Sequence, residues 1–153
     1  MTKGDAVSVR DLIVGTYRVA LMEYYAEDGE VGRPYGETPL GFAFYSAEGY
    51  TSTILSRDDR VDFVGGDIMS GTDDEKLAAF ATAGAFSGRW ELVDDTILHH
   101  LECTTFPNWV GTTQVRPFEV DEDSLTLYPP KMLMNGKIRS AKVRLDRIKE
   151  QWS

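Results

Sequence analysis

Hydrophobic and polar residues alternate along most of this chain, in short segments separated by turn residues. Alternation at every second position predicts strands with one buried face. The predicted strands cover residues 12–21, 41–45, 50–55, 86–93, 96–104, 111–120, 125–128 and 138–145. Because most of them are joined by tight turns, the pattern predicts an all-β fold, an eight-stranded antiparallel up-and-down β-barrel.

One segment departs from the strand pattern and predicts a short helix near residues 73–83. Thr72 and Glu75 have the spacing of a capping box, in which each side chain bonds the backbone of the other residue. Gly84 is expected to end the helix. The residues expected to form its buried stripe are Leu77, Phe80 and Ala81. Earlier in the chain, between the first two predicted strands, residues 27–41 form a long loop rich in Gly and Pro. Loops of this length often border a functional site.

Length and charge narrow the class of protein. With 153 residues, the chain is expected to form one domain over residues 1–153. A formal net charge of −9 argues against binding to nucleic acid or to an anionic membrane surface, because both need clustered basic residues. The N-terminal residues lack the apolar run of a secretory signal, and no segment approaches the roughly 20 apolar residues of a membrane helix.

The chain has one cysteine, Cys103, so it cannot form an intrachain disulfide. This fits a cytoplasmic protein, because disulfides are common in secreted proteins of this size. Cys103 has no cationic neighbour in the sequence, and we expect it to be an inert, buried thiol.

Two adjacent histidines make the strand at 96–104 the first candidate for a functional site. His100 shares a face with Glu102, whereas His99 shares the other face with Leu101. On hydrophobicity alone, the His99 face would point inward. A histidine can donate or accept a proton near neutral pH, and a neighbouring carboxylate can orient it. The alternative is a buried polar pair with a purely structural role.

Metal and cofactor sites are not expected. Adjacent histidines on a strand point to opposite faces, so His99 and His100 cannot bind one metal ion together. The chain has no other histidine and no cysteine pair, so we expect no zinc site. It also contains neither a P-loop nor a dinucleotide-binding fingerprint, so we expect no nucleotide cofactor.

The strand at 111–120 offers a guanidinium group. Arg116 shares a face with Gln114, and its planar fork of donors could bind a carboxylate, an enolate or a carbonyl oxygen. The alternative is a salt bridge to Glu102 or Glu91. The same two interpretations apply to Arg89. Aromatic residues that could line a pocket rather than pack in the core include Tyr45, Tyr50, Trp90 and Trp109.

Several short motifs occur in a fixed order. They are Gly15-Thr16-Tyr17, Pro39-Leu40-Gly41 followed by Tyr45, Gly49-Tyr50, Ser87-Gly88-Arg89, His99-His100-Leu101-Glu102, Pro107-Asn108-Trp109 and Gly111-Thr112-Thr113-Gln114-Val115-Arg116. Over residues 11–147 the chain resembles a small lipocalin-like domain family of the calycin superfamily, found in bacteria and fungi. Tyr17 stands where the first-strand signature of calycins has Trp. The resemblance implies a barrel with an interior pocket for a small apolar molecule, closed beneath Tyr17 by a basic residue, Arg144 or Arg147.

The resemblance also favours His100 as the inward histidine, and it leads to two hypotheses of function. The first is a cofactor-independent cyclase, isomerase or dehydratase acting on a polyketide- or terpenoid-like metabolite. In it, His100 transfers protons, Glu102 orients His100 and Arg116 binds an oxyanion, or the closure is driven by shape alone. The second is a non-catalytic carrier of a small apolar ligand. In both, the expected ligand-binding residues are Tyr45, Tyr50, Arg89, Trp90, Trp109 and Gln114.

The sequence is also compatible with a homodimer and with a role that involves no ligand. The chain could form a homodimer in either hypothesis. It could also be a purely structural interaction domain, in which case the interior of the barrel would be filled.

Overall fold

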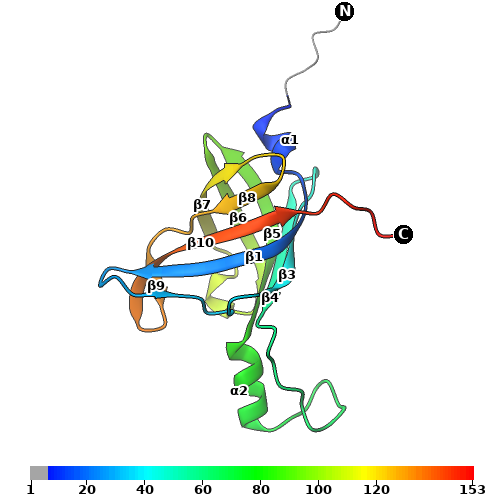
Figure 1. The fold of residues 1–153 in the computed structure, drawn as a ribbon, viewed down its shortest axis with the longest axis vertical. Helices are drawn as coiled ribbons and strands as arrows, with labels where there is room; N and C mark the ends of the chain where they lie inside the picture. The colour runs from blue at the N-terminus through cyan, green and yellow to red at the C-terminus, as the bar shows by residue number, and fades with distance from the viewer. Residues whose placement is uncertain (1–6) are drawn as a thin grey trace, which may run out of the picture.

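A computed structural model describes residues 7–153, in which ten strands form one antiparallel sheet that closes on itself (Figure 1). Eight of them make the barrel, in the order β1-β3-β4-β5-β6-β7-β8-β10, and pairing of β1 with β10 closes it. The short strands β2 and β9 extend two of its hairpins. The strands are β1 (Gly15–Ala26), β2 (Val31–Gly32), β3 (Leu40–Tyr45), β4 (Tyr50–Ser56), β5 (Ala83–Val93), β6 (Thr96–Thr104), β7 (Thr113–Val120), β8 (Ser124–Leu127), β9 (Met132–Met134) and β10 (Lys137–Arg147). The predicted eight-stranded antiparallel barrel is confirmed.

The start of the first predicted strand is wrong. The helix α1 (Val9–Ile13) precedes β1, and β1 then continues to Ala26, beyond the predicted end at Leu21. The side chain of Ser8 caps α1 by accepting a hydrogen bond from the backbone of Asp11. Alternation alone did not separate five helical residues from the strand that follows.

One end of the barrel is closed by α1, which Figure 1 shows above the strands. Ile13 is fully buried there, and the Tyr17 hydroxyl donates to its carbonyl at 2.5 Å. The guanidinium of Arg147 lies over the Tyr17 ring, 4.9 Å from its centroid, and donates to two backbone carbonyls at the end of α1. Arg147 is therefore the closing residue. Arg144 is exposed and pairs with Asp146 instead.

Gly15 makes room for this closure. A Cβ atom at that position would lie only 2.6 Å from Nη1 of Arg147. Any other residue would therefore displace the guanidinium from the Tyr17 ring. The glycine of the Gly15-Thr16-Tyr17 motif has a packing role in this chain.

The helix α2 (Asp73–Ala81) projects away from the opposite end of the barrel (Figure 1). Its capping box is confirmed, because Thr72 and Glu75 bond each other's backbone. The expected buried stripe is wrong: Leu77 and Phe80 are 67% and 58% exposed, and α2 has no buried residue. The helix ends at Ala81 with Thr82 as its C-cap, and not at Gly84, which lies within β5. It stands outside the barrel, so no second layer covers its apolar residues.

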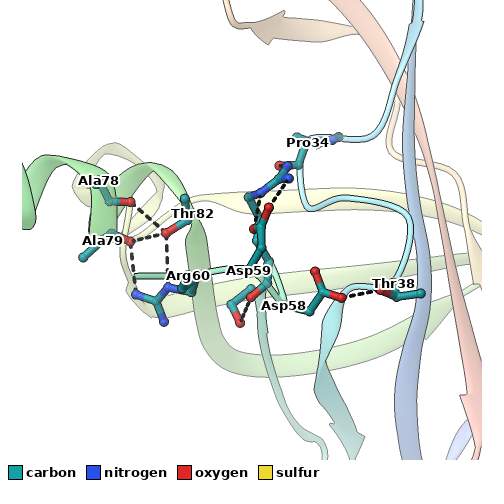
Figure 2. Close-up of polar contacts among 10 residues, drawn as sticks. Pro34, Thr38, Asp58, Asp59, Arg60, Ala78, Ala79 and Thr82 are labelled. Atoms are coloured by element: carbon teal, nitrogen blue, oxygen red, sulfur yellow. Dashed lines mark hydrogen bonds and ion pairs between the residues drawn. The ribbon is translucent and has the colours of Figure 1, made fainter. Parts of the chain in front are cut away.

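Polar contacts join the segment that follows β4 to the end of α2 and to the loop before β3 (Figure 2). Arg60 donates to Thr82 Oγ1 at 3.1 Å and to the carbonyl of Ala79 at 3.4 Å. The hydroxyl of Thr38 donates to Asp58 at 2.5 Å. No helix among residues 7–153 is long and apolar enough to span a membrane.

The inner face of the barrel differs between its two ends. Large, buried side chains fill the half next to α1: Tyr17, Tyr45, Trp90, Ile97, Leu125 and Leu145. Towards the opposite end, several inward positions carry small residues, and others carry side chains that are only half-buried. The small ones are Gly41, Thr53, Gly84 and Ala141, and the half-buried ones are Met22, Tyr24, Phe86 and Gln114.

Candidate functional site

Polar side chains meet in the middle of the barrel interior, where apolar packing gives way to small residues. His99 lies on the inner face of β6, directly between Trp90 of β5 and Gln114 of β7 in the sheet. Its side chain is 1% exposed. Arg116 lies on the same inner face of β7, paired with the buried Ile97. Alternation along β6 and β7 therefore brings an imidazole and a guanidinium to one interior face.

Tyr45 completes this group from the other side of the barrel. Its hydroxyl lies 2.8 Å from Nε2 of His99, and the two rings are 5.7 Å apart. We assign the hydroxyl as the donor to Nε2, which is an acceptor in one of the two tautomers of neutral histidine. The ring proton of neutral His99 is then on Nδ1, which is buried and has no hydrogen-bond partner within residues 7–153.

Burial keeps His99 neutral. Loss of solvation is the main cause that lowers its pKa from 6.5 to about 3, and the positive charge of Arg116 adds to the effect. Burial also raises the pKa of Tyr45 well above its usual value, while Arg116 opposes that rise. At neutral pH the interior therefore holds an uncharged imidazole and an uncharged phenol.

Arg116 is the charged member of the group. Its side chain is 5% exposed, and its Nη1 donates to the carbonyl of Val115 at 2.9 Å. No carboxylate within residues 7–153 forms an ion pair with it, so the expected salt bridge to Glu102 or Glu91 is wrong. Burial lowers the pKa of Arg116 to about 10, which still leaves it protonated at neutral pH.

The predicted inward orientation of His100 is wrong. His100 lies on the outer face of β6, where its ring bonds Thr113 Oγ1 at 2.9 Å and Glu91 Oε1 at 3.0 Å. Hydrophobic alternation explains the outcome, because Ile97, His99 and Leu101 are the buried positions of β6. The residues alone indicated this face, and the family resemblance indicated the other.

Glu102 is also outside the barrel, 3.9 Å from Arg89 on the outer surface. The structure therefore does not bring His100 and Glu102 together with Arg116. Their catalytic roles stay predictions, without a shared interior site to support them.

A β-bulge shifts the end of β6. Two neighbouring residues of β5, Ser87 and Gly88, pair with Cys103 and Leu101, so Glu102 is the extra residue. Gly88 allows this close approach, since a Cβ there would lie 2.0 Å from the carbonyl oxygen of His100. The shift turns Cys103 outward, and the expected buried thiol is wrong, because Cys103 is exposed.

The six expected ligand-binding residues divide into three groups. Tyr45, Trp90 and Gln114 lie on the inner face. Trp109 belongs to the short helix η1 (Pro107–Trp109) and packs edge-on against Phe86 at the end away from α1. Tyr50 and Arg89 lie on the outer surface and do not reach the interior.

Two residues of this group are not among the predicted site residues. His99 was set aside in favour of its neighbour, although alternation along its strand indicated it. Phe86, whose ring centroid is 6.1 Å from that of His99, gave no signal beyond its place in a predicted strand. Its inward direction depends on the register of β5 against β4, which the sequence does not specify.

A pocket of about 670 Å³ lies outside the barrel, between α2 and the segment before it. Its lining mixes carboxylates with apolar side chains: Asp59, Asp62, Asp67, Asp74, Glu75, Val61, Phe63 and Ile68. Within residues 7–153, no three His, Cys, Asp or Glu residues are arranged to hold a metal ion. This pocket lacks the buried, unpaired donors that distinguish the interior group.

Comparison with known proteins agrees with this architecture. The family model of the lipocalin-like domain matches residues 14–147, which is most of the chain. The chain belongs to the lipocalin-like domain family. One curated relative is the 4'-hydroxy-3'-methoxypropiophenone carrier protein of Aspergillus oryzae, which is 35% identical over 71 residues. That match covers 41% of this lipocalin-like chain and 64% of the relative, which is less than two thirds of the relative's length.

Proposed function

We propose that this lipocalin-like barrel binds a small, largely apolar molecule in its interior and acts as a carrier. The observation that carries the proposal is a pair of diagonal neighbours on the inner face of β6 and β7: Arg116 is a buried cation, and His99 has an unpaired, buried Nδ1. Buried polar groups are normally paired, because an unpaired one loses its bonds to water without replacement. A ligand with a polar end would supply the missing partner.

The remaining inner surface suits an apolar ligand body. Between the polar group and the end away from α1, the inner face carries the half-buried side chains of Met22 and Phe86, whose apolar surface a ligand could contact. Phe86 and Trp109 add aromatic surface at the same end. An eight-stranded barrel has room for one small ligand. The Aspergillus oryzae relative is a carrier of 4'-hydroxy-3'-methoxypropiophenone, an aryl ketone, and this supports the same class of ligand.

Catalysis is the second candidate function. Arg116 supports it, because a buried guanidinium can stabilise an enolate formed in an isomerisation or cyclisation. Against it, the low pKa of His99 makes the imidazole a weak base at neutral pH. His100 and Glu102, expected as the acid–base pair, lie outside. The carrier role therefore has better support than the cyclase, isomerase or dehydratase role.

Calorimetric titration with 4'-hydroxy-3'-methoxypropiophenone tests binding. Gln114→Trp adds bulk on the inner face beside His99, whereas Val115→Trp adds the same bulk on the outer face. We expect the wild-type chain to bind, Gln114→Trp to lose at least about tenfold in affinity, and Val115→Trp to bind as the wild type does.

Two outcomes would overturn the carrier proposal. One is absence of binding by the wild-type chain. The other is an equal loss for both tryptophan variants, which would mean that the ligand does not sit inside the barrel. Conversion of the ligand during the titration, detected by chromatography, would favour the catalytic candidate instead.

A further inference from the structure

Charge is distributed unequally inside the barrel. Among the described residues, the buried charged side chains are two arginines, Arg116 and Arg139, and no carboxylate is buried. Arg139 has its counter-ion, since Glu30 lies 3.1 Å from it, and it also donates to the carbonyl of Asn135. Arg116 donates to the carbonyl of Val115 in its own strand and forms no ion pair with a carboxylate of residues 7–153. The interior therefore contains one cation whose charge nothing within residues 7–153 offsets.

The other buried titratable groups on the inner face cannot supply an anion at neutral pH. Tyr45 and Tyr17 stay protonated, because burial raises the pKa of both phenols. His99 is neutral and presents Nδ1–H as a further donor without an acceptor. Donors thus gather at one place in the barrel, with no acceptor strong enough to balance a guanidinium.

We propose that the ligand of this barrel carries an acidic oxygen, a phenol, enol or carboxylic acid, and binds as the anion on Arg116 and His99 Nδ1. The inference rests on the proposed binding function and adds the ionisation state of the ligand. A neutral carbonyl would satisfy the donors but leave the buried charge uncompensated, which is costly in a medium of low polarity. An anion accepts hydrogen bonds from the donors and also compensates the buried charge. Hydrogen bonds between a guanidinium and an oxyanion are among the stronger ones.

The net charge of −9 does not prevent this arrangement. Exposed carboxylates are separated from the interior by the barrel wall and are screened by salt over about 10 Å. Because Arg116 is buried, the salt ions of the solvent do not screen its charge. The guanidinium therefore dominates the electrostatic field in its part of the interior. The anionic end would therefore be drawn to the interior although the surface is acidic.

The test uses two probes of nearly equal shape, 4-nitrophenol and 4-nitroanisole. The phenol changes colour when it ionises, whereas the methyl ether cannot ionise. With protein in excess, we expect the apparent pKa of bound 4-nitrophenol to fall by at least about one unit, a tenfold preference for the phenolate. Arg116→Met should abolish this shift while 4-nitroanisole binds wild type and variant within about threefold.

The variant is expected to fold, because replacing a buried ion by an apolar side chain of similar length is often neutral or stabilising. Two further measurements keep the test decisive whatever its stability. Arg116→Lys retains the charge and should retain a downward shift of the phenol pKa. The wild-type shift should also survive high salt, because a buried cation is poorly screened.

The outcomes separate this inference from the carrier proposal. If 4-nitroanisole binds and Gln114→Trp excludes it, but bound 4-nitrophenol shows no pKa shift, the anionic ligand is wrong and the carrier proposal stands. A shift that persists in Arg116→Met would also overturn the inference, because another cation would then be responsible. If neither probe binds the wild-type chain, both proposals fail.

Discussion

Tyr45 bonds His99 across the barrel interior, with its hydroxyl 2.8 Å from Nε2. The two residues are 54 positions apart, on strands β3 and β6, which are not neighbours in the sheet. The contact therefore joins opposite parts of the barrel wall through its centre. It fixes the imidazole ring and determines which nitrogen carries the proton.

Tyr45→Phe removes this contact and leaves both nitrogens of His99 unpaired in the interior. We expect the free energy of unfolding to fall by about 1–3 kcal/mol, the usual effect of a buried polar group without its partner. Urea denaturation measures it. Tyr50→Phe is the matched control, since Tyr50 is 58% exposed, and it should change stability by less than about 0.5 kcal/mol. Equal effects of the two variants would contradict the interior hydrogen bond.

The lowered pKa of His99 predicts a pH dependence of stability. Below about pH 6.5 the unfolded chain protonates this histidine, while the folded chain does not until about pH 3. The unfolded state then binds more protons, so stability falls as the pH decreases through this window. Between about pH 6 and pH 4, the loss due to His99 should be about 2.5 kcal/mol.

Carboxylates also titrate in this range, so the comparison is with His99→Gln, which keeps them and removes the imidazole. The variant should lose less stability than the wild type between the two pH values, although it is less stable at neutral pH. Parallel stability curves for the two proteins would mean that His99 is accessible to protons in the folded state.

Much of the fold could be predicted from the sequence, because the barrel is built from local signals. Alternation identified the eight barrel strands, and the Thr72–Glu75 pair identified the start of α2. Two errors have physical reasons. The five residues of α1 are too few for a helical period to differ from alternation. The apolar residues of α2 suggested a buried stripe, but burial depends on a neighbouring layer, and the fold supplies none there.

The site was less predictable, because it depends on contacts between distant strands. Alternation along β6 placed His99 inward, and it was more reliable than the family pattern that favoured His100. The bulge at Glu102 was invisible, since it arises from the register of β6 against Gly88. No spacing rule connects Tyr45 with His99, because only closure of the barrel brings them together.

Cys103 should react in the folded protein. The bulge turns its side chain to the outer surface, where the thiol is exposed. We expect a thiol-specific reagent such as 5,5'-dithiobis(2-nitrobenzoate) to modify it in native buffer, at a rate within about tenfold of that in denaturant. Reaction only after unfolding would mean that β6 continues without the bulge and keeps Cys103 inside.

The closed end of the barrel offers a test with two arginines of one strand. Arg147 lies over Tyr17 and donates to backbone carbonyls, including that of Val14 at 3.0 Å, whereas Arg144 is exposed and pairs with Asp146. Arg147→Ala removes the cation–π contact and leaves those carbonyls without their donor, so we expect a loss of about 1–3 kcal/mol. Arg144→Ala removes one surface ion pair and should cost less than about 0.5 kcal/mol.

Arg147→Lys separates the contribution of the positive charge from that of the hydrogen bonds to backbone carbonyls. Lysine keeps the positive charge but lacks the planar fork that reaches several carbonyls at once, so its stability should lie between those of the wild type and Arg147→Ala. Denaturant midpoints of the four proteins, compared at constant slope, measure these differences. If Arg144→Ala proved as destabilising as Arg147→Ala, the arginine over Tyr17 would not be what closes the barrel.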